Sequence, residues 1–316
     1  MSETPAPSPS GGNALPEAIR SFSYILGSAW RDESNRNERL KRVLLAGGWQ
    51  AWKRLVRKPV SVALFNGLRF RAYPECNSSS AVFYTRIPNF EPISFIRQHV
   101  QGGTLVDIGA NVGMMSLLLA DCFAAGWLFE PNPVAAARAR ENIRLNHLPF
   151  EVHEIALSDA CGSIEFENRG GVNGCNRAVI GFRTENPTIS VPRFTFDEFL
   201  EQHAPPAPIT ALKVDVEGHE NAVFRGMERF LTRQRPRLIM FEYLQRTKIT
   251  ETFEIFSRAG YQILELTTKG PRRATVEVRP LQDLFACPEE QMAEFLRPAV
   301  EPDVHPSAAI SAASSC

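Results

Sequence analysis

The sequence has no net charge and no compact cysteine pattern. Its 316 residues include 35 basic and 35 acidic side chains, and this balance argues against a general nucleic-acid or membrane-surface binder. The six cysteines are scattered, and no Cys-x-x-Cys pair occurs. This usage fits reduced thiols in a cytoplasmic protein better than a disulfide framework or a zinc site.

Long apolar runs are also missing. The first twenty residues hold no basic segment followed by an apolar one, so we expect no signal peptide. The longest apolar stretch, residues 112–129, is interrupted by Ser116, Asp121 and Gly126. It therefore predicts a helix, a turn and a strand, and we expect no membrane span.

A third absence concerns the glycines of a dinucleotide fingerprint. That motif reads Gly-x-Gly-x-x-Gly and lets a helix N-terminus meet a pyrophosphate. Counting from Gly109, the chain has Asn111 and Met114 at the second and third glycine positions. It has instead an acid before the turn, Asp107, and a later glycine, Gly113. A carboxylate at that place would repel a pyrophosphate, but it suits a cationic ligand such as S-adenosylmethionine.

A second acid, Glu130, ends the next apolar strand, 21 residues after Gly109. An acid at this point of a doubly wound sheet accepts hydrogen bonds from both ribose hydroxyls of a nucleoside. Charge-assisted hydrogen bonds of this kind are worth roughly 1.5–3 kcal/mol each. The alternative is an ordinary strand–helix–strand unit whose glycines only pack helix on strand. Acid, turn and distal Glu together favour the nucleoside site.

Strands and helices alternate from about residue 91 onward. This pattern predicts an α/β fold, a doubly wound and mostly parallel sheet with helices on both faces. The expected helices are 91–99, 112–122, 133–146, 219–232 and 249–259, and the expected strands are 104–108, 127–130, 150–156, 209–216, 237–243, 261–267 and 274–280, with an inserted hairpin or loop at 163–168 and 189–194.

The ends of the chain differ from this central region. Residues 15–57 show helical periodicity, and Asn66-Gly67 predicts a β-hairpin. The tails are rich in proline and small residues, and we expect them to be disordered. The expected division is a tail over 1–14, a helical and hairpin extension over 15–90, a nucleoside-binding domain over 91–285 and a second tail over 297–316.

A second polar cluster follows a buried strand. Asp215 and Glu217 lie two residues apart and share a face in extended chain, and Gly218, His219 and Glu220 follow them. The cluster therefore falls at the carboxyl edge of the sheet, where such folds bind ligands. Acids near a helix N-terminus gain about 0.3–1 kcal/mol from the dipole alone, and a single histidine is usually structural. The set as a whole, and no single member, indicates function.

Three further polar residues end strands. Glu242 ends the strand at 238–241 and is a weaker candidate for the same edge. Ser158 and Asp159 follow the third strand and are placed to meet the amino group of an adenine, although Asp159 can equally be a turn residue.

With these residues in view, the chain resembles the FkbM family of S-adenosylmethionine-dependent methyltransferases over about residues 80–265. The resemblance rests on Val106–Gly113, Phe129–Pro133, Ala156–Asp159 and Lys213–Glu220. Many methyltransferases share the first block, while the last, at the right distance, is more specific. The resemblance implies a class I methyltransferase fold, whose seven-stranded sheet ends in an antiparallel hairpin. It also implies O-methylation of a hydroxyl on a sugar or natural product, and it adds Asn132 to the expected cofactor site.

For the reaction, we expect the acceptor oxygen, the methyl group and the sulfur to be aligned in one line. Positioning of this kind contributes roughly 7–11 kcal/mol. Because an alcohol is a poor nucleophile at neutral pH, a base helps, and our hypothesis assigns this role to His219, oriented by Asp215 or Glu217. In a variant, Asp215 and Glu217 hold a divalent ion that binds a sugar diol and lowers the pKa of its hydroxyl.

Two rival functions stay open. A non-catalytic module would bind S-adenosylmethionine without transfer and would not need the acids at 215–220. A nicotinamide-dependent oxidoreductase is disfavoured by Asn111, Met114 and Asp107. We expect a small-molecule or glycan acceptor, no nucleic-acid partner, and an N-terminal extension that covers the cleft mouth and shapes acceptor choice. The acceptor, the metal dependence and the oligomeric state stay open.

Overall fold

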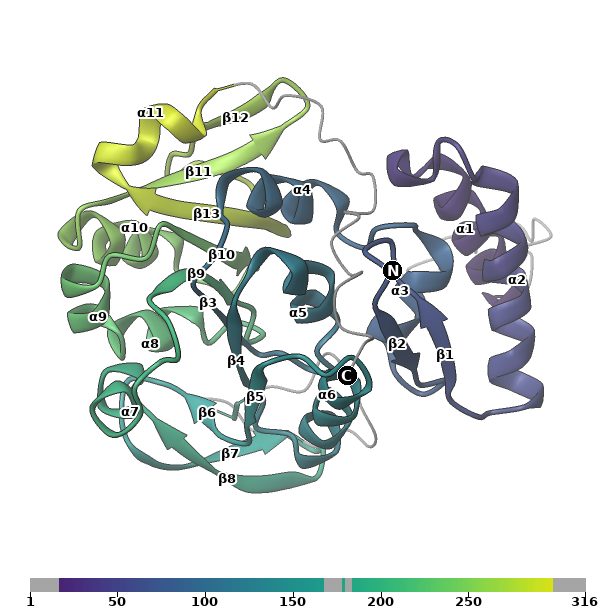
Figure 1. Ribbon diagram of the computed structural model, residues 1–316, viewed down its shortest axis with the longest axis horizontal. Coiled ribbons are helices and arrows are strands. Elements are labelled where there is room, and N and C mark those ends of the chain that lie inside the picture. Colours follow the sequence, from purple (N-terminus) through teal and green to yellow (C-terminus); the bar gives the residue numbers. More distant parts are fainter. Residues whose placement is uncertain (1–16, 168–177, 180–183, 298–316) are drawn as a thin grey trace, which may run out of the picture.

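The computed structural model describes residues 17–167, 178–179 and 184–297, and it contains one large mixed sheet with an N-terminal group of helices beside it (Figure 1). The disorder expected for residues 1–14 and 297–316 concerns segments that lie outside these ranges, apart from Arg297. Among the described residues, no helix is both long and apolar enough to cross a membrane.

The N-terminal group consists of helices around a short hairpin. Its elements are α1 (Glu17–Arg31), η1 (Glu33–Asn35), α2 (Arg39–Leu55), β1 (Val60–Ala63), β2 (Arg69–Ala72), α3 (Asn77–Tyr84) and α4 (Phe90–His99). The hairpin β1–β2 is antiparallel, as Asn66-Gly67 predicts, and Gly67 takes a left-handed φ of 82° in its turn. Trp49 of α2 stacks on Phe83 of α3 with ring centroids 4.1 Å apart, which holds these two helices together.

The central sheet and its helices follow from residue 104. Its elements are β3 (Thr104–Ile108), α5 (Met114–Leu119), η2 (Ala120–Cys122), β4 (Ala125–Phe129), α6 (Pro133–Leu145), β5 (Phe150–His153), β9 (Ile209–Val214), α8 (Glu220–Arg225), α9 (Glu228–Arg233), β10 (Leu238–Tyr243), α10 (Ile249–Arg258), β11 (Tyr261–Thr267), β12 (Gly270–Arg273), β13 (Gln282–Pro288), η3 (Glu289–Gln291) and α11 (Met292–Phe295). A separate three-stranded sheet contains β6 (Ala156–Leu157), β7 (Gly162–Glu167) and β8 (Thr188–Phe194), and α7 (Phe196–Gln202) follows it.

The large sheet has the strand order β12-β11-β13-β10-β9-β3-β4-β5. Strands β5, β4, β3, β9 and β10 are parallel neighbours, whereas β13 runs antiparallel to both β10 and β11. This is an α/β arrangement that ends in antiparallel strands, as expected. The sheet has eight strands where seven were expected, because β12 extends its edge.

The expected strand at 274–280 is wrong. Residues 275–278 alternate polar and apolar, but the Val278 N–H donates to the Thr275 carbonyl and closes a turn, and Pro280 has no N–H to give to a ladder. The two strands on either side of this segment, β12 and β13, take its place.

The expected helix at 219–232 is split into α8 and α9, with Gly226 directly after α8. A Cβ on Gly226 would lie 1.9 Å from the Ser158 carbonyl oxygen, so the two segments can only approach this closely at glycine. The expected strand at 150–156 is also shorter, because Ala156 and Leu157 leave the large sheet and pair with β8.

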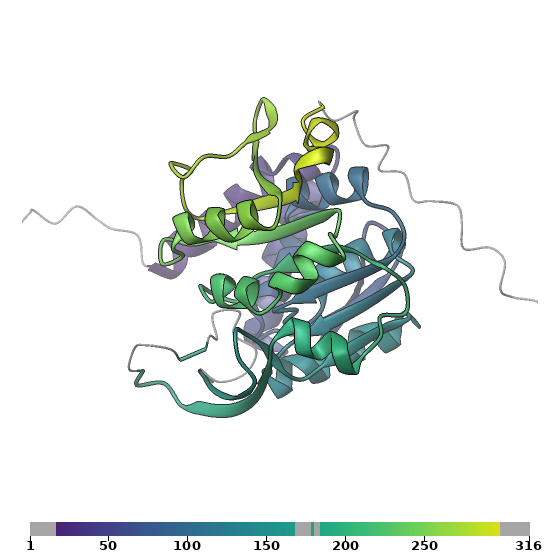
Figure 2. The same ribbon diagram turned by 90° about the vertical axis from the view of Figure 1, so that its left-hand side faces the viewer.

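Each face of the large sheet has its own apolar core. Successive side chains of a strand point to opposite faces, so in β3 Leu105 packs on one side while Val106 and Ile108 pack on the other. The Leu105 face is covered by α4, α5 and α6, and the Val106 face by α7 to α10. Figure 2 shows the green helices in front of the sheet and the purple N-terminal helices behind it.

Candidate active site

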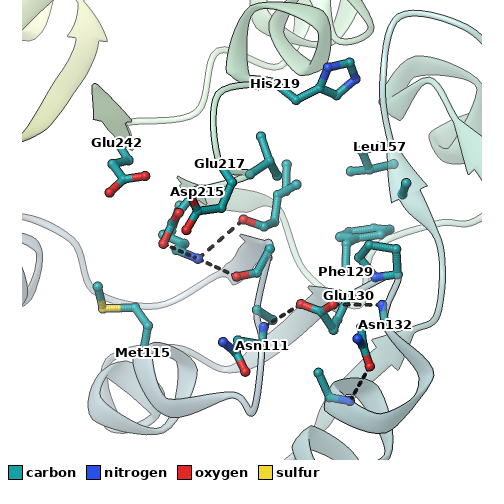
Figure 3. Close-up of a pocket in the computed structure, with 18 of the residues that line it drawn as sticks. Asn111, Met115, Phe129, Glu130, Asn132, Leu157, Asp215, Glu217, His219 and Glu242 are labelled. Carbon is teal, nitrogen blue, oxygen red and sulfur yellow. Dashed lines mark hydrogen bonds and ion pairs between the residues drawn. The ribbon is translucent and has the colours of Figure 1, made fainter. Parts of the chain in front are cut away.

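A pocket of about 360 Å³ opens where β3, β4, β9 and β10 reach their carboxyl ends (Figure 3). The order of the sheet reverses here, because β3 has β4 on one side and the much later β9 on the other. Such switch points leave a crevice between adjacent loops. The polar residues that line it are Ser78, Asn89, Asn111, Glu130, Asn132, Lys213, Asp215, Glu217, His219 and Glu242.

The turn after β3 forms one wall of the pocket. Gly109 has a φ of 77°, and a Cβ on it would lie 1.9 Å from the Asp215 carbonyl oxygen. Glycine is therefore required for both its backbone conformation and the contact with the loop after β9. Asn111 also takes a left-handed φ, 51°, and its Nδ2 donates to Ser78 Oγ at 3.3 Å. This bond joins the N-terminal helices to the pocket.

Glu130 follows β4 and is held by two backbone amides. The Asn111 N–H donates to its Oε2 and the Asn132 N–H to its Oε1, each at 2.8 Å. Burial raises the pKa of Glu130 to about 7, although these two hydrogen bonds act in the opposite direction. Each carboxylate oxygen keeps a further lone pair, so Glu130 can still accept hydrogen bonds from a ligand in the pocket.

Two predicted cofactor residues begin helices. Asn132 lines the pocket, and its Oδ1 caps α6 by accepting the N–H groups of Val134 and Ala135 at 2.9 and 3.1 Å. Gly113 stands before α5 with a φ of 77°, and its Cβ position faces Ala139 and Leu128. Gly113 does not line the pocket, and its contact with the cofactor stays a prediction.

Asp107 differs from the prediction that its carboxylate meets a cationic ligand. Its side chain is fully buried, lies 3.2 Å from Lys213 Nζ, and accepts a hydrogen bond from Ser116 Oγ at 2.6 Å. Lys213 Nζ also donates to the Gly109 carbonyl at 2.7 Å and lies 3.4 Å from Asp215. Asp107 therefore acts through Lys213, a pocket residue that the sequence analysis did not assign to the site.

Burial alone would lower the pKa of Lys213, but the carboxylates of Asp107 and Asp215 outweigh it and raise that pKa. Lys213 therefore stays protonated and links β3 to the loop after β9.

Asp215, Glu217 and Glu242 form what we call the acidic trio. Carboxylate oxygens of all three lie within 4.8 Å of one another, and Figure 3 shows them gathered on one side of the pocket. Glu217 is not extended, since its φ is 57°, so a turn and not a shared strand face brings it to Asp215. Glu242, the weaker candidate from the sequence, is thus brought to the same place as the other two acids.

Two members of the trio are paired with cationic side chains. Arg246 pairs with Glu217 at 2.7 Å and Lys213 with Asp215, whereas Glu242 Oε2 is buried and accepts no hydrogen bond among the described residues. Burial and the nearby charge of Asp215 raise the pKa of Glu242 to about 8. At neutral pH this side of the pocket therefore holds a proton on Glu242.

His219 points away from the acidic trio (Figure 3). Its Nε2 is 2.9 Å from Ser158 Oγ. The partner of His219 is therefore Ser158, whereas we expected Asp215 or Glu217. Burial lowers the pKa of His219 to about 4, and the ring is neutral at physiological pH. Ser158 is fully buried beneath it.

Ser158 and Asp159 do not line the pocket, and their contact with adenine stays a prediction. Asp159 turns to Arg225 of α8, whose Nη2 donates to it at 2.8 Å. Glu220, the third acid of the sequence cluster, is also structural, because its Oε1 accepts the Gly218 N–H at 2.9 Å.

The pocket residues missed by sequence reasoning include Ser78 and Asn89. Both lie outside every motif in the sequence, so no motif could have identified them.

Residues 107–263 match the family model of the methyltransferase FkbM domain. The chain carries an FkbM methyltransferase domain. The match begins at the buried Asp107 and includes both the turn after β3 and the loop after β9, so the family's sequence pattern covers most of the pocket. The chain is also 34% identical over 129 residues to the hexuronic acid methyltransferase AglP of Haloferax volcanii. That alignment covers 39% of this chain and 49% of the relative, so the chain spans about half the relative's length.

Two solved structures are similar to this FkbM-type chain. One is methyltransferase FkbM from Methylobacillus flagellatus, with 15% identity, a TM-score of 0.41, and coverage of 85% of this chain and 58% of that one. The other is a SAM-dependent methyltransferase from Agrobacterium tumefaciens, with 12% identity, a TM-score of 0.41, and coverage of 73% and 70%.

Proposed function

We propose that this FkbM methyltransferase uses S-adenosylmethionine to methylate a hydroxyl of a sugar, glycan or natural product. The observation that carries the proposal is Glu130, a buried carboxylate fixed by two backbone amides beside the Gly109 turn. A fixed carboxylate at the end of the second parallel strand suits the two hydroxyls of a ribose. The proposed cofactor contacts are Gly109, Asn111, Glu130 and Asn132, while Asp107 supports them through Lys213.

For the base, we now favour Asp215 over His219. Asp215 lines the pocket with a side chain that is 42% exposed, so an acceptor hydroxyl can reach it. His219 is hydrogen-bonded to Ser158 through its Nε2 and points away from the acidic trio, so it is less available to an acceptor hydroxyl there. Glu217 and Glu242 lie beside Asp215, with carboxylate oxygens of the three within 4.8 Å of one another.

A divalent cation on the acidic trio is the alternative to a carboxylate base. Three carboxylate oxygens within 4.8 Å are the kind of ligand that Mg²⁺ and Ca²⁺ prefer. The similarity to a hexuronic acid methyltransferase sharpens this alternative, because the acidic trio would repel the carboxylate of a uronic acid unless a cation lay between them.

Thermal shift tests the cofactor. S-adenosylhomocysteine should raise the melting temperature and NADH should not, since ligand at about 100 times its Kd stabilises by roughly 2.7 kcal/mol. Glu130→Gln should reduce this shift, because the amide NH₂ would face a backbone N–H donor and lose about 1–3 kcal/mol. Glu151→Gln, an exposed carboxylate on β5, is the matched control. A shift with NADH and none with S-adenosylhomocysteine would contradict the methyltransferase assignment and favour an oxidoreductase.

Methyl transfer tests the base. Asp215→Asn should lower kcat by about 10²–10⁴-fold, and His219→Ala should cost much less. Glu201→Gln removes a surface ion pair with Arg229 outside the pocket and should leave kcat unchanged. If His219→Ala abolished transfer while Asp215→Asn did not, the base would be His219.

A screen with radiolabelled methyl donor identifies the acceptor. Neutral and uronic glycans should be compared with and without Mg²⁺ and a chelator, together with hydroxylated natural products. If transfer to uronic acceptors requires Mg²⁺, the result supports a cation on the acidic trio. If a chelator leaves transfer unchanged, the cation hypothesis is wrong. Tight S-adenosylmethionine binding without transfer to any acceptor would favour a non-catalytic module.

A further inference from the structure

Helix α2 has one face that packs on the protein and one that does not. Ala46, Trp49 and Gln50 are buried, and the Trp49 Nε1–H donates to Ser80 of α3 at 2.9 Å. On the opposite side, Leu40 and Leu44 are each 67% exposed. An amphipathic surface helix normally turns its apolar side inward, so α2 has a second apolar stripe that needs another explanation.

We call the exposed stripe the α2 apolar face and define it by Leu40, Leu44, Ala51 and Leu55. These positions are separated by four, seven and four residues, a spacing that keeps them on one side of an α-helix. Leu55 is 83% exposed and Ala51 is exposed as well. Figure 1 shows α2 at the right-hand edge of the molecule, away from the large sheet. Contiguous exposed apolar surface of this kind marks interaction sites.

Two half-exposed indoles lie on the same pair of helices. Trp52 of α2 is 37% exposed and Trp30 of α1 is 51% exposed, and the Arg39 guanidinium lies 5.9 Å from the Trp30 ring. Tryptophan is favoured where one side of a residue meets apolar material and the other meets water. Its place here fits a boundary between lipid and water.

The charge around this face is strongly positive. Residues 36–58 contain eight basic side chains and a single acid, Glu38, whereas the whole chain has equal numbers of basic and acidic side chains. The basic residues of this segment are Arg36, Arg39, Lys41, Arg42, Lys53, Arg54, Arg57 and Lys58. Of these, Arg54, Arg57 and Lys58 are exposed at the C-terminal end of α2. Two copies joined through this face would bring the same positive charges together, which disfavours a self-complementary dimer.

We propose that the α2 apolar face docks on an anionic lipid surface. The leucines and Trp52 enter the boundary between headgroups and acyl chains, and the surrounding Lys and Arg side chains meet the lipid phosphates. Each basic residue near an anionic bilayer contributes about 1 kcal/mol, or roughly fivefold in binding. The net charge of the chain does not reveal this basic surface, because acids elsewhere in the sequence offset the excess of Lys and Arg over residues 36–58. The inference does not depend on the methyl-transfer reaction.

Co-sedimentation of the full chain with vesicles tests the proposal. The protein should bind an equimolar mixture of phosphatidylcholine and phosphatidylglycerol, bind phosphatidylcholine alone much more weakly, and be released by salt. Leu44→Glu with Leu55→Glu should weaken binding at least about tenfold, and Arg54→Gln with Lys58→Gln should weaken it about 25-fold at most.

Two matched controls keep this test specific. Leu281→Glu replaces another leucine, 68% exposed, in the loop before β13, and Lys269→Gln removes an exposed charge between β11 and β12. Both should bind vesicles like the wild type, and circular dichroism should show that all variants are folded. Equal binding to both vesicle types, or no binding, would overturn the proposal. A dimer that Leu44→Glu with Leu55→Glu dissociates, without vesicle binding, would assign the face to a second copy.

Discussion

The two sides of the pocket handle their carboxylates in opposite ways. On the side of β3 and β4, Glu130 receives one backbone N–H on each oxygen. On the side of β9 and β10, the acidic trio brings three carboxylates within 4.8 Å and leaves Glu242 Oε2 without a hydrogen bond among the described residues. The first side is organised before any ligand arrives, as a binding site requires, and the second holds closely spaced acidic groups that a reaction or an ion can use.

Lys213 joins these two sides, so its loss should have the largest effect. Lys213→Met would leave the fully buried Asp107 with Ser116 as its donor and should lower the free energy of unfolding by about 3–5 kcal/mol. Urea denaturation measures the change. Lys248→Met, at an exposed site, is the control.

A second substitution checks the cause of that loss. Adding Asp107→Asn to Lys213→Met removes the buried charge and should restore part of the stability, which a double-mutant cycle quantifies. If Lys213→Met unfolded at the same urea concentration as the wild type, the contacts of Lys213 with the two sides of the pocket would not stabilise the fold.

Gly109 provides the contact between the sides, and Gly109→Ala should have the next largest effect. The new Cβ would lie 1.9 Å from the Asp215 carbonyl, at a φ of 77°, and left-handed strain alone costs about 1–3 kcal/mol. We expect weaker S-adenosylhomocysteine binding in calorimetry together with lower stability. Gly48→Ala, where nothing lies within 4 Å of the Cβ, should not weaken binding, and unchanged binding in Gly109→Ala would contradict the close contact.

Glu242 should show an effect on stability whose size depends on pH. Between pH 4.5 and about 8 the unfolded chain releases this proton while the folded chain keeps it, so the wild type loses stability as pH rises through that window. Glu242→Gln removes this loss. Its melting temperature should exceed that of the wild type by a margin that widens toward pH 8, at roughly 2–4 °C for each kcal/mol.

The surface carboxylate Glu228, paired with Arg258, gives the control for this measurement. Glu228→Gln should follow the wild-type pH dependence. A constant difference between Glu242→Gln and the wild type across the window would show that Glu242 is ionised throughout.

Much of the sheet could be predicted because its strands are continuous apolar runs that end in glycine or acid. Strand β3 has the predicted bounds, and β4, β9 and β10 lie within one or two residues of theirs. The predictions failed where tertiary contacts decide the backbone, as at Gly226, which meets the Ser158 carbonyl. No local pattern reports such a contact between residues that are far apart in the chain.

For the site, the sequence located the correct edge but not the direction of each side chain. Asp107 and Gly109 are two residues apart, yet only Gly109 lines the pocket, while Asp107 is buried and pairs with Lys213 on the neighbouring strand. His219 was expected to be oriented by Asp215 or Glu217, whereas its partner comes from the segment after β6. A motif fixes which residues share an edge, and the register of neighbouring strands fixes which of them face the ligand.

The chain has four tryptophans, and their exposure divides them by region. Trp49 and Trp127 are only 3% and 2% exposed, whereas Trp30 and Trp52 are open to solvent on α1 and α2. Iodide should therefore quench the emission of the second pair alone. The unlabelled protein thus contains its own fluorescent reporter. Binding at α1 or α2 should shift the tryptophan emission to the blue and reduce its quenching by iodide, while the two buried indoles give a constant background.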